Sequence, residues 1–477
     1  MIIGPRLKVI SDEELNWIHN SSLKILEETG IVFHSSEALE ICKKHGVKVE
    51  GKTAFFSSDG VENALETCPK KFKWRARNNE RSVVVGDEKE KLLIQPNAGP
   101  VFIQDLDKGR RLATLQDYTN IIKLCQASEV INLVGSTPVD PSDVSQDDKH
   151  LHMMYQTLKN SDKPAIGCPA YGVKVRQMLD MVEIAMGERG FLEQNHCIGV
   201  GVDPLSPLAF ATDACETIIE YARQKQIVFF PSAVMAGFSG PISLIGTVIL
   251  QNTEILAGIT LAQLINPGNP VGYSVASTVA SMKTGNFITA SPETMLIQVA
   301  GMQMGLDLYK LPTRSMCGMT DSKTPDCQAG YDTMQNLMMG VLGGAHIVVE
   351  CMGVLDFIMT TSYEKFVIDQ ELLRRVSRIR EGIDTSVKED AVRIIQEMGH
   401  EAGYINHRDT LENFRSRWMP SVSDWETYDS WKEAGSESII EKANRMYKEI
   451  LSDAPDTLVT PELDKELKAY MGRALKG

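Results

Sequence analysis

The chain has 477 residues, of which 43% are hydrophobic and 23% charged, a composition typical of a folded protein with a large core. Its formal net charge of −14 argues against a nucleic-acid-binding protein, which would carry a basic face, and against attraction to anionic membranes. The nine cysteines form no CxxC pair, acidic residues come too early for a signal peptide, and no apolar run reaches the ~20 residues of a membrane span. We therefore predict a cytoplasmic protein with reduced thiols.

The first part of the chain, residues 1–90, predicts a helical cap with short hairpins. Residues 12–29 and 36–45 have the apolar spacing of helices, and short β-rich runs follow them. We expect this cap to pack against the domain that comes next.

From about residue 91 to residue 381, short β-rich runs alternate with amphipathic runs. The predicted strands are 92–96, 131–136, 165–168, 197–202, 227–231, 271–275, 312–317 and 347–351. The predicted helices are 115–127, 147–160, 173–187, 207–224, 246–265, 291–307, 327–343 and 363–376. About eight βα units in about 280 residues favour an α/β fold, a TIM (β/α)8 barrel with a parallel sheet. A doubly wound sheet is the alternative, but no GxGxxG follows the first strand to indicate a dinucleotide site.

Capping signals support these helices. Ser291, Pro292 and Glu293 supply a cap residue, a proline at the first helical position and an acid in the first turn. Thr114 and Asp117 have the spacing of a capping box. After residue 382 the chain reads as helical again, so we predict a C-terminal helical extension over 382–477.

The loop after the seventh predicted strand, residues 317–328, carries more polar side chains than a connection needs. In a barrel, the loops after the strands are where ligands bind. This loop and four other stretches together resemble the trimethylamine methyltransferase family: NAGPVFIQDLDKGRRLATLQDY (97–118), QNTEILAGITLAQLINPGNPVGY (251–273), ASPETMLIQVAGMQMG (290–305), CGMTDSKTPDCQAGYD (317–332) and HRDTLENFRSRW (407–418).

The resemblance implies a TIM barrel that passes a methyl group from a methylated amine to the cobalt of a separate corrinoid protein. Archaeal trimethylamine enzymes of the family carry a pyrrolysine, which would fall in or near residues 316–323, but this chain has only standard residues. The pyrrolysine-lacking branch implies a quaternary amine as methyl donor, with glycine betaine as the best fit. Proline betaine, carnitine and γ-butyrobetaine are alternatives, as is a betaine-binding barrel without catalysis. The expected partners are a cognate corrinoid protein and further copies of the chain.

A quaternary nitrogen leaves as a neutral amine, so we expect no covalent or acid–base catalytic residue and no protein-bound metal. The substrate's carboxylate needs an arginine or backbone N–H groups, and its trimethylammonium favours aromatic faces or a carboxylate. Arg314, near the end of a predicted strand, could clamp the carboxylate or form an ion pair within its loop. Tyr273 and Tyr171, at or just past strand ends, could face the methyl groups or fill the core.

Four further residues are candidates with an equally plausible structural role. Asn97 could bind ligand or hold the turn after the first strand, and Asp321 could line the pocket or cap the next helix. His346 and Glu350 are predicted to alternate onto one face of the last strand and to line the pocket. A zinc site with Cys351 is disfavoured, because His-x₃-Glu on a strand is not a ligand spacing.

The aromatic residues Trp418, Trp425, Tyr428 and Trp431 lie close together in the C-terminal extension. They could cover the barrel mouth, dock the corrinoid protein, or simply pack the extension onto the surface.

Overall fold

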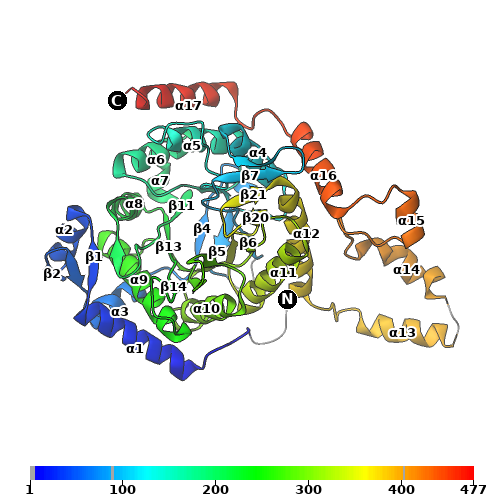
Figure 1. Cartoon of the computed structure of the whole chain (residues 1–477), viewed down its shortest axis with the longest axis horizontal. Coiled ribbons are helices and arrows are strands. Elements are labelled where there is room, and N and C mark those ends of the chain that lie inside the picture. The colour runs from blue at the N-terminus through cyan, green and yellow to red at the C-terminus, as the bar shows by residue number, and fades with distance from the viewer. Residues whose placement is uncertain (1–5, 88–90, 401–402, 477) are drawn as a thin grey trace.

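In the computed structural model, which describes residues 6–87, 91–400 and 403–476, eight parallel strands form the predicted TIM barrel (Figure 1). The strands are β6 (Leu93–Ile94), β9 (Val134–Gly135), β10 (Ala165–Ile166), β11 (Ile198–Gly201), β13 (Ile227–Ser232), β15 (Val271–Val275), β18 (Thr313–Met316) and β19 (Ile347–Val349). They follow one another around the sheet in chain order, and β19 pairs with β6. The N–H groups of Asn132 and Leu133 donate to the carbonyl of Ile94 at 3.0 and 3.2 Å, which closes the ring.

A ring of helices surrounds the strands (Figure 1). They are α4 (Leu115–Ala127), α5 (Lys149–Asn160), α6 (Gly172–Met186), α7 (Phe191–Gln194), α8 (Thr212–Arg223), α9 (Leu244–Ile265), α10 (Pro292–Gln303) with a π-turn (Met304–Leu308), α11 (Cys327–Gly343) and α12 (Tyr363–Glu381). The predicted caps are confirmed: the Ser291 side chain accepts from the N–H of Thr294, and Thr114 and Asp117 form a capping box. Several of these helices pack on barrel strands that are next to them in the chain: α8 on β13, α9 on β13 and β15, α10 on β15 and β18, and α11 on β19.

The N-terminal segment packs on the outside of α9. Its elements are α1 (Asp12–Glu28), β1 (Ile31–Phe33), α2 (Ser36–Lys44), β2 (Lys48–Glu50), β3 (Thr53–Phe55), α3 (Ser58–Thr67), β4 (Phe72–Trp74), a 3-10 turn (Asn79–Arg81) and β5 (Val83–Val85). Helix α3 was not predicted; its ten residues, capped by Ser57, lie where only short hairpin-like runs were expected.

Helix α9 is apolar all round because it is covered on both sides, by the barrel strands and by α1, α2 and α3. Among the described residues it is the one helix long and apolar enough to span a membrane, but 78% of its most apolar window is buried inside the protein. Its position is that of a core helix.

A hairpin from the N-terminal segment closes the amino-terminal end of the barrel. Trp74 of β4 is 1% exposed and packs against Phe229 of β13, with ring centroids 6.1 Å apart. A Cβ on Gly199 of β11 would lie 2.3 Å from the Trp74 ring, so only glycine leaves room for the indole. The cavity of the barrel can therefore open only at the opposite end, where the carboxyl ends of the strands meet.

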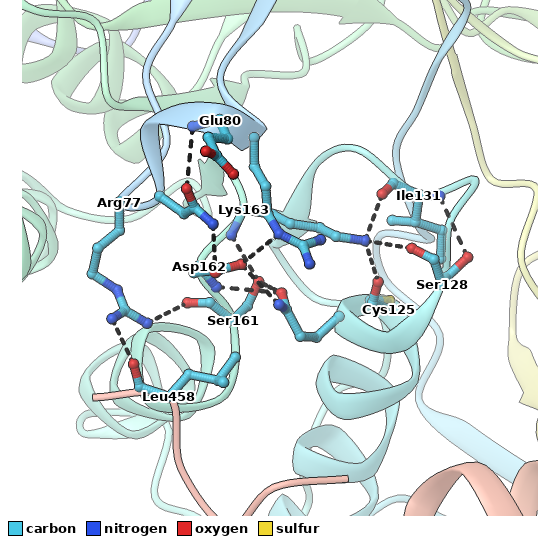
Figure 2. Close-up of polar contacts among 12 residues, drawn as sticks. Arg77, Glu80, Cys125, Ser128, Ile131, Ser161, Asp162, Lys163 and Leu458 are labelled. Carbon is cyan, nitrogen blue, oxygen red and sulfur yellow. Dashed lines mark hydrogen bonds and ion pairs between the residues drawn. The ribbon is translucent and has the colours of Figure 1, made fainter. Parts of the chain in front are cut away.

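Buried cations fasten the loops at this closed end (Figure 2). The Lys163 ammonium donates to the carbonyl oxygens of Cys125, Ser128 and Ile131 at 2.7–2.8 Å. Arg77 donates to the carbonyls of Ser161 and Leu458, at 3.0 and 2.7 Å. It thereby ties the N-terminal segment to the end of α5 and to the C-terminal segment. These contacts hold the closed end of the barrel together, so ligands can bind only at the open end.

Two small sheets stand at the open end. One combines β14 (Met235–Ala236), β16 (Thr278–Ala280) and β17 (Phe287–Ile288), and the other combines β20 (Val354–Leu355), β21 (Thr360–Ser362), β7 (Phe102–Asp105) and β8 (Gly109–Leu112). A further strand, β12 (Ala209–Phe210), pairs with β1 of the N-terminal segment. Backbone hydrogen bonds within these two sheets therefore fix the loops that follow β6, β13, β15 and β19.

The C-terminal segment first leaves the barrel and then returns to it (Figure 1). Its helices are α13 (Lys388–Met398), a 3-10 turn (Tyr404–Asn406), α14 (Arg408–Asn413), a second 3-10 turn (Phe414–Ser416), α15 (Tyr428–Glu433), α16 (Ile439–Asp453) and α17 (Pro461–Ala474). Helix α16 packs on α12 and α4, and α17 packs on α5 and α6. The extension is helical as predicted, whereas domain boundaries at residues 90 and 381 stay a prediction.

Candidate active site

A cavity of about 390 Å³ opens at the carboxyl ends of the barrel strands, and every one of the eight strands or the loop after it contributes to its wall. The residues that line it are Gln95, Ala98, Gly99, Ser136, Thr137, Asp140, Pro169, Gly201, Asp203, Pro231, Ala233, Ala276, Phe287, Arg314, Met316, Glu350 and Ile358. This is the place where barrels of this type bind their ligands, and the volume suits a small molecule. A second hollow of about 330 Å³, bordered by α6 and α7, receives no residue from a barrel strand.

Arg314 forms part of the cavity wall and is 5% exposed. Its Nε donates to Gln95 Oε1 at 3.1 Å and its Nη1 to Ser274 Oγ at 2.8 Å, so a residue that follows β6 and one in the neighbouring strand β15 fix the guanidinium. A guanidinium has five N–H donors, and these two bonds leave three for a ligand. Burial lowers the pKa of Arg314, while the nearby carboxylates of Glu350 and Asp203 oppose that shift.

Glu350 comes directly after β19, the neighbour of β18, and is 2% exposed. Its backbone is left-handed, with φ at +59°, which turns the side chain out of the strand's alternation. Its Oε1 accepts the N–H of Ala98 at 2.8 Å, and Oε2 has no hydrogen-bond partner among the described residues. Burial raises the pKa of Glu350 to about 8 despite the attraction of Arg314. The group is therefore largely protonated at pH 7 and buries one unused oxygen beside the cavity.

Asp203 brings a second carboxyl group to the cavity from β11, three strands away from Arg314. Its side chain lines the cavity and is exposed to solvent there, and the partial loss of surrounding water raises its pKa to about 6, against the opposing effect of Arg314. The buried Glu254 of α9 holds the loop that follows, since it accepts from Ser206 Oγ at 2.7 Å and from the N–H of Leu208 at 2.9 Å. At pH 7 the cavity thus has a cation on one side and an anion nearly opposite.

A third carboxylate in the wall, Asp140, is paired with the Lys149 ammonium at 2.9 Å, and much of the remaining wall is apolar. Pro169, Pro231, Ala276 and Met316 are small or unbranched, and Phe287 of β17 is the one aromatic ring among the lining residues that the structure describes. Ile358 reaches the cavity from a hairpin loop in which Asp356, Phe357 and Ile358 are all left-handed, with φ of +54°, +55° and +73°. Such a conformation is rare for a β-branched residue and places Ile358 at the rim. An apolar wall around two opposite charges excludes water from a bound ligand.

Of the seven predicted site residues, the structure brings Arg314 and Glu350 together in the cavity. Tyr273 lies outside the lining: it is fully buried and its hydroxyl donates to Asn252 Oδ1 of α9 at 2.8 Å, on the outer face of its strand. Tyr171 is 57% exposed and precedes the first turn of α6. Both tyrosines are explained by packing or helix entry, and substrate contact at Arg314 and Glu350 stays a prediction.

The other three predicted residues also lie outside the lining. Asn97 holds the turn after β6: its Nδ2 donates to the carbonyl of Met352 at 2.6 Å and its Oδ1 accepts that residue's N–H. Asp321 accepts from the N–H and hydroxyl of Thr289, while Asp326 is the helix cap. His346 lies before β19 and Glu350 after it, so the prediction that they share one face of the strand was wrong.

The missed residues are Asp203, Gln95 and Phe287. Asp203 directly follows the predicted strand 197–202 and Gln95 lies within the predicted strand 92–96, so the strand-end position that singled out Arg314 could also have found them. Phe287 comes from a strand that was not predicted. No three His, Cys, Asp or Glu side chains in the described part of the chain come together as a metal-binding group.

The family model described as trimethylamine methyltransferase (MTTB) matches residues 3–476 of this chain. The chain belongs to the trimethylamine methyltransferase family. It is 35% identical to a glycine betaine methyltransferase of Desulfitobacterium hafniense over 98% of this chain and 97% of that protein. It is 33% identical to a proline betaine:corrinoid methyltransferase of Eubacterium limosum over 87% of each chain, and 28% identical to the trimethylamine methyltransferase MttB of Methanosarcina barkeri over 99% and 96%.

The fold of this family member is also that of a solved barrel. The crystal structure of the monomethylamine methyltransferase of Methanosarcina barkeri matches with a TM-score of 0.54 and 11% identity, over 95% of this chain and 90% of that one. In the present chain the stretch 316–323, expected to correspond to the pyrrolysine position, begins at the cavity wall with Met316 and then turns into the protein, where the Thr320 hydroxyl donates to Asp332 at 2.7 Å. Standard side chains therefore fill this part of the wall.

Proposed function

We propose that this enzyme transfers a methyl group from glycine betaine to the cobalt of a cognate corrinoid protein and leaves dimethylglycine. The observation that supports the proposal best is the pairing of Arg314 with Asp203 on opposite sides of one small cavity. Glycine betaine is a zwitterion that carries a carboxylate and a trimethylammonium. Arg314 and Asp203 supply one unpaired charge of each sign, since Asp140 of the same wall is paired with Lys149, and this arrangement complements the zwitterion. The 35% identical glycine betaine methyltransferase points to the same substrate.

Arg314 suits the carboxylate end. Its guanidinium is held by Gln95 and Ser274, so it loses little side-chain freedom when a ligand binds, and a charge-assisted hydrogen bond to a carboxylate is the strong kind. Arg314 is the second residue of β18, below the strand's end, so a carboxylate bound there leaves the trimethylammonium toward the barrel mouth. Asp203 and the ring of Phe287 then border the ammonium, which aromatic faces and carboxylates both stabilise.

This placement accounts for the chemistry. A quaternary nitrogen already carries the charge that makes a neutral amine leave, so the protein supplies no proton and no covalent group. A reduced corrinoid supplies the nucleophile that accepts the methyl group. The residues of the chain orient one N-methyl toward the open end and keep water away from it; orientation of two reactants can contribute about 7–11 kcal/mol. The apolar side chains that exclude water include Pro169, Pro231 and Ala276 of the cavity wall.

Proline betaine is a second candidate, favoured by the 33% identity to a proline betaine:corrinoid methyltransferase. It carries the same two charges at similar separation, with a ring that links the nitrogen to the α-carbon in place of one N-methyl group. Arg314 and Asp203 would hold it in the same way. The fit of each donor against the apolar wall would therefore determine which of the two is preferred.

The purified protein should be mixed with free cob(I)alamin and each donor in turn, and the spectrum of methylcob(III)alamin followed. We expect turnover with glycine betaine, less with proline betaine, and none with trimethylamine. The Arg314→Gln variant should lose the reaction, and the control Arg176→Gln, on the outer face of α6, should keep it. Binding of glycine betaine without turnover of any donor would instead identify a non-catalytic betaine-binding barrel.

We expect the enzyme to work in the cytoplasm, where reducing conditions suit both a low-valent cobalt and nine cysteines that are all free thiols.

A further inference from the structure

The turn between β20 and β21 reaches the cavity in an unusual backbone conformation. Its residues Asp356, Phe357 and Ile358 are all left-handed, with φ of +54°, +55° and +73°. Residues other than glycine enter this region at a cost and usually one at a time, and a β-branched residue such as isoleucine does so least readily. The last of the three, Ile358, is partly buried and lines the cavity. A strained segment of this kind persists only where the surrounding structure holds it.

Arg110 of β8 holds the turn from one side. Its Nη2 donates to Asp356 Oδ2 and its Nε donates to Thr360 Oγ1, both at 3.0 Å. These two acceptors stand before and after the tip of the turn, so one guanidinium bridges it. The Cζ atom of Arg110 also lies 3.5 Å from the ring centroid of Phe102 in β7. The planar guanidinium is therefore oriented by an aromatic face while its donors fix the turn.

The loop after β18 holds the same turn from the other side. The N–H of Asp356 donates to the carbonyl of Ser322 at 2.7 Å, and the N–H of Met359 donates to the carbonyl of Asp356 at 2.9 Å. The Lys323 ammonium lies 3.9 Å from the ring centroid of Phe357. The turn is thus fastened to two neighbouring loops and closed on itself. Its cavity-lining side chain is held in place and does not easily move aside.

We propose that Ile358 determines which betaine the cavity accepts, because it limits the length of the spacer between the carboxylate and the ammonium. This inference rests on the proposed function, in which Arg314 of β18 binds the carboxylate and the ammonium points toward the barrel mouth. A longer spacer moves the ammonium farther toward the rim, where it meets the side chain of Ile358. An apolar wall that fits its ligand discriminates against one extra methylene group by roughly 10-fold or more.

The residue type at position 358 supports a role for the side chain itself. Glycine would adopt the left-handed backbone of this turn without strain, and asparagine would do so with less strain than isoleucine. Glycine would leave the cavity wider, and asparagine would bring a polar group to its apolar wall. Ile358 therefore places a branched apolar side chain at the rim in spite of the backbone conformation, which is expected where the shape of the wall selects the ligand.

The experiment measures, by isothermal titration calorimetry at pH 7, the affinities for glycine betaine, β-alanine betaine and γ-butyrobetaine, whose spacers have one, two and three methylene groups. The affinity of the wild type should fall about 10-fold or more with each added methylene group. Ile358→Ala should reduce the preference for glycine betaine over γ-butyrobetaine at least about 10-fold, and Ile358→Leu, which keeps the bulk, should retain most of it. The control Met359→Ala shortens the next side chain, which is 43% exposed and outside the cavity lining, and should leave the preference unchanged.

Arg110→Gln provides a second readout from outside the cavity. It removes the bridge between Asp356 and Thr360, so the preference should fall as well, by a smaller factor, whereas a purely structural role of Arg110 would weaken all three ligands equally. A wild type that binds a longer betaine at least as tightly as glycine betaine, or an unchanged preference in Ile358→Ala, would overturn the inference and leave the betaine-binding site standing. A wild type that binds none of the three ligands would overturn the proposed function, and this inference with it.

Discussion

Replacement of Arg314 by glutamine tests the substrate orientation, because it should change the affinities for two ligands in opposite senses. Glycine betaine carries a carboxylate and choline does not, while both carry the trimethylammonium. In the wild type, Arg314 attracts the carboxylate of one ligand and repels the cationic charge of the other. The variant keeps a polar but shorter side chain beside Gln95 and Ser274 and removes the charge.

The size of the effect follows from the buried position of Arg314. A hydrogen bond between charged groups contributes about 1.5–3 kcal/mol, which corresponds to a loss of roughly 10- to 150-fold in affinity for glycine betaine. Choline should bind the variant as well as the wild type or more tightly, since a buried cation no longer opposes it. Asp203 and Glu350 lose their counter-ion, so their pKa values should rise, and the titrations belong at about pH 7, where Glu350 is largely neutral in both proteins.

Isothermal titration calorimetry of both ligands against wild type, Arg314→Gln and the surface control Arg176→Gln measures the difference without any corrinoid. An equal loss of affinity for the two ligands would show that Arg314 supports the cavity without contacting the carboxylate. An unchanged affinity for glycine betaine would place the carboxylate elsewhere in the cavity.

Three further predictions concern the site and the framework. Affinity for choline should strengthen as pH rises through about 8, because Glu350 gains its negative charge there, and Glu350→Gln should remove this dependence in titrations from pH 6.5 to 9.5. Gly199→Ala should lower the free energy of unfolding by about 1–3 kcal/mol through overpacking against Trp74, whereas Gly330→Ala, with open space around it, should not. Lys365→Met should cost about 3–5 kcal/mol in chemical denaturation by leaving the fully buried Asp369 without its partner at 2.7 Å, and Lys365→Met/Asp369→Leu should recover much of that loss.

The barrel could be predicted because its strands are short apolar runs between helices that carry their own caps. Most strands of the barrel are buried on both faces and read as continuous apolar runs that need no alternation, whereas β18 carries the polar residues Thr313, Arg314 and Ser315. Helix α3 was not predicted because it has few apolar positions and polar residues surround them; these positions are Val61, Ala64 and Leu65. It is held by packing on α9, a contact between segments far apart in the chain.

To predict the site residues, one must also know to which face of its strand each side chain points. Tyr273 and Ser274 are neighbours in β15 and point to opposite faces: Tyr273 bonds Asn252 of α9, while Ser274 bonds Arg314 inside the barrel. An error of one position therefore exchanges a core residue for a residue at the cavity. When both faces of a strand are buried, the sequence carries no signal that shows which alternate residues face the cavity.

Glu350 lines the cavity because its backbone departs from the regular conformation of the strand. It lies four positions after His346, which predicts the same face in a regular strand, but β19 ends at Val349 and Glu350 takes a left-handed backbone. The turn brings its carboxyl group beside the Arg314 charge in a place with little water, and its pKa rises to about 8. A conformation that is costly for a non-glycine residue is retained here at the wall of the cavity.

The protonation state of Glu350 then determines which kind of ligand the cavity prefers. With Glu350 neutral and Asp140 paired with Lys149, the cavity holds one unpaired positive charge on Arg314 and one unpaired negative charge on Asp203, which matches a zwitterion. With Glu350 ionised, the net charge becomes negative, a simple cation is favoured, and the new carboxylate competes with the substrate's own for Arg314. The preference for glycine betaine over choline should therefore be greatest between pH 6, where Asp203 ionises, and pH 8, and should decline above it. A raised pKa at this one buried carboxyl group is thus a means of selecting a betaine without any direct contact to its methyl groups.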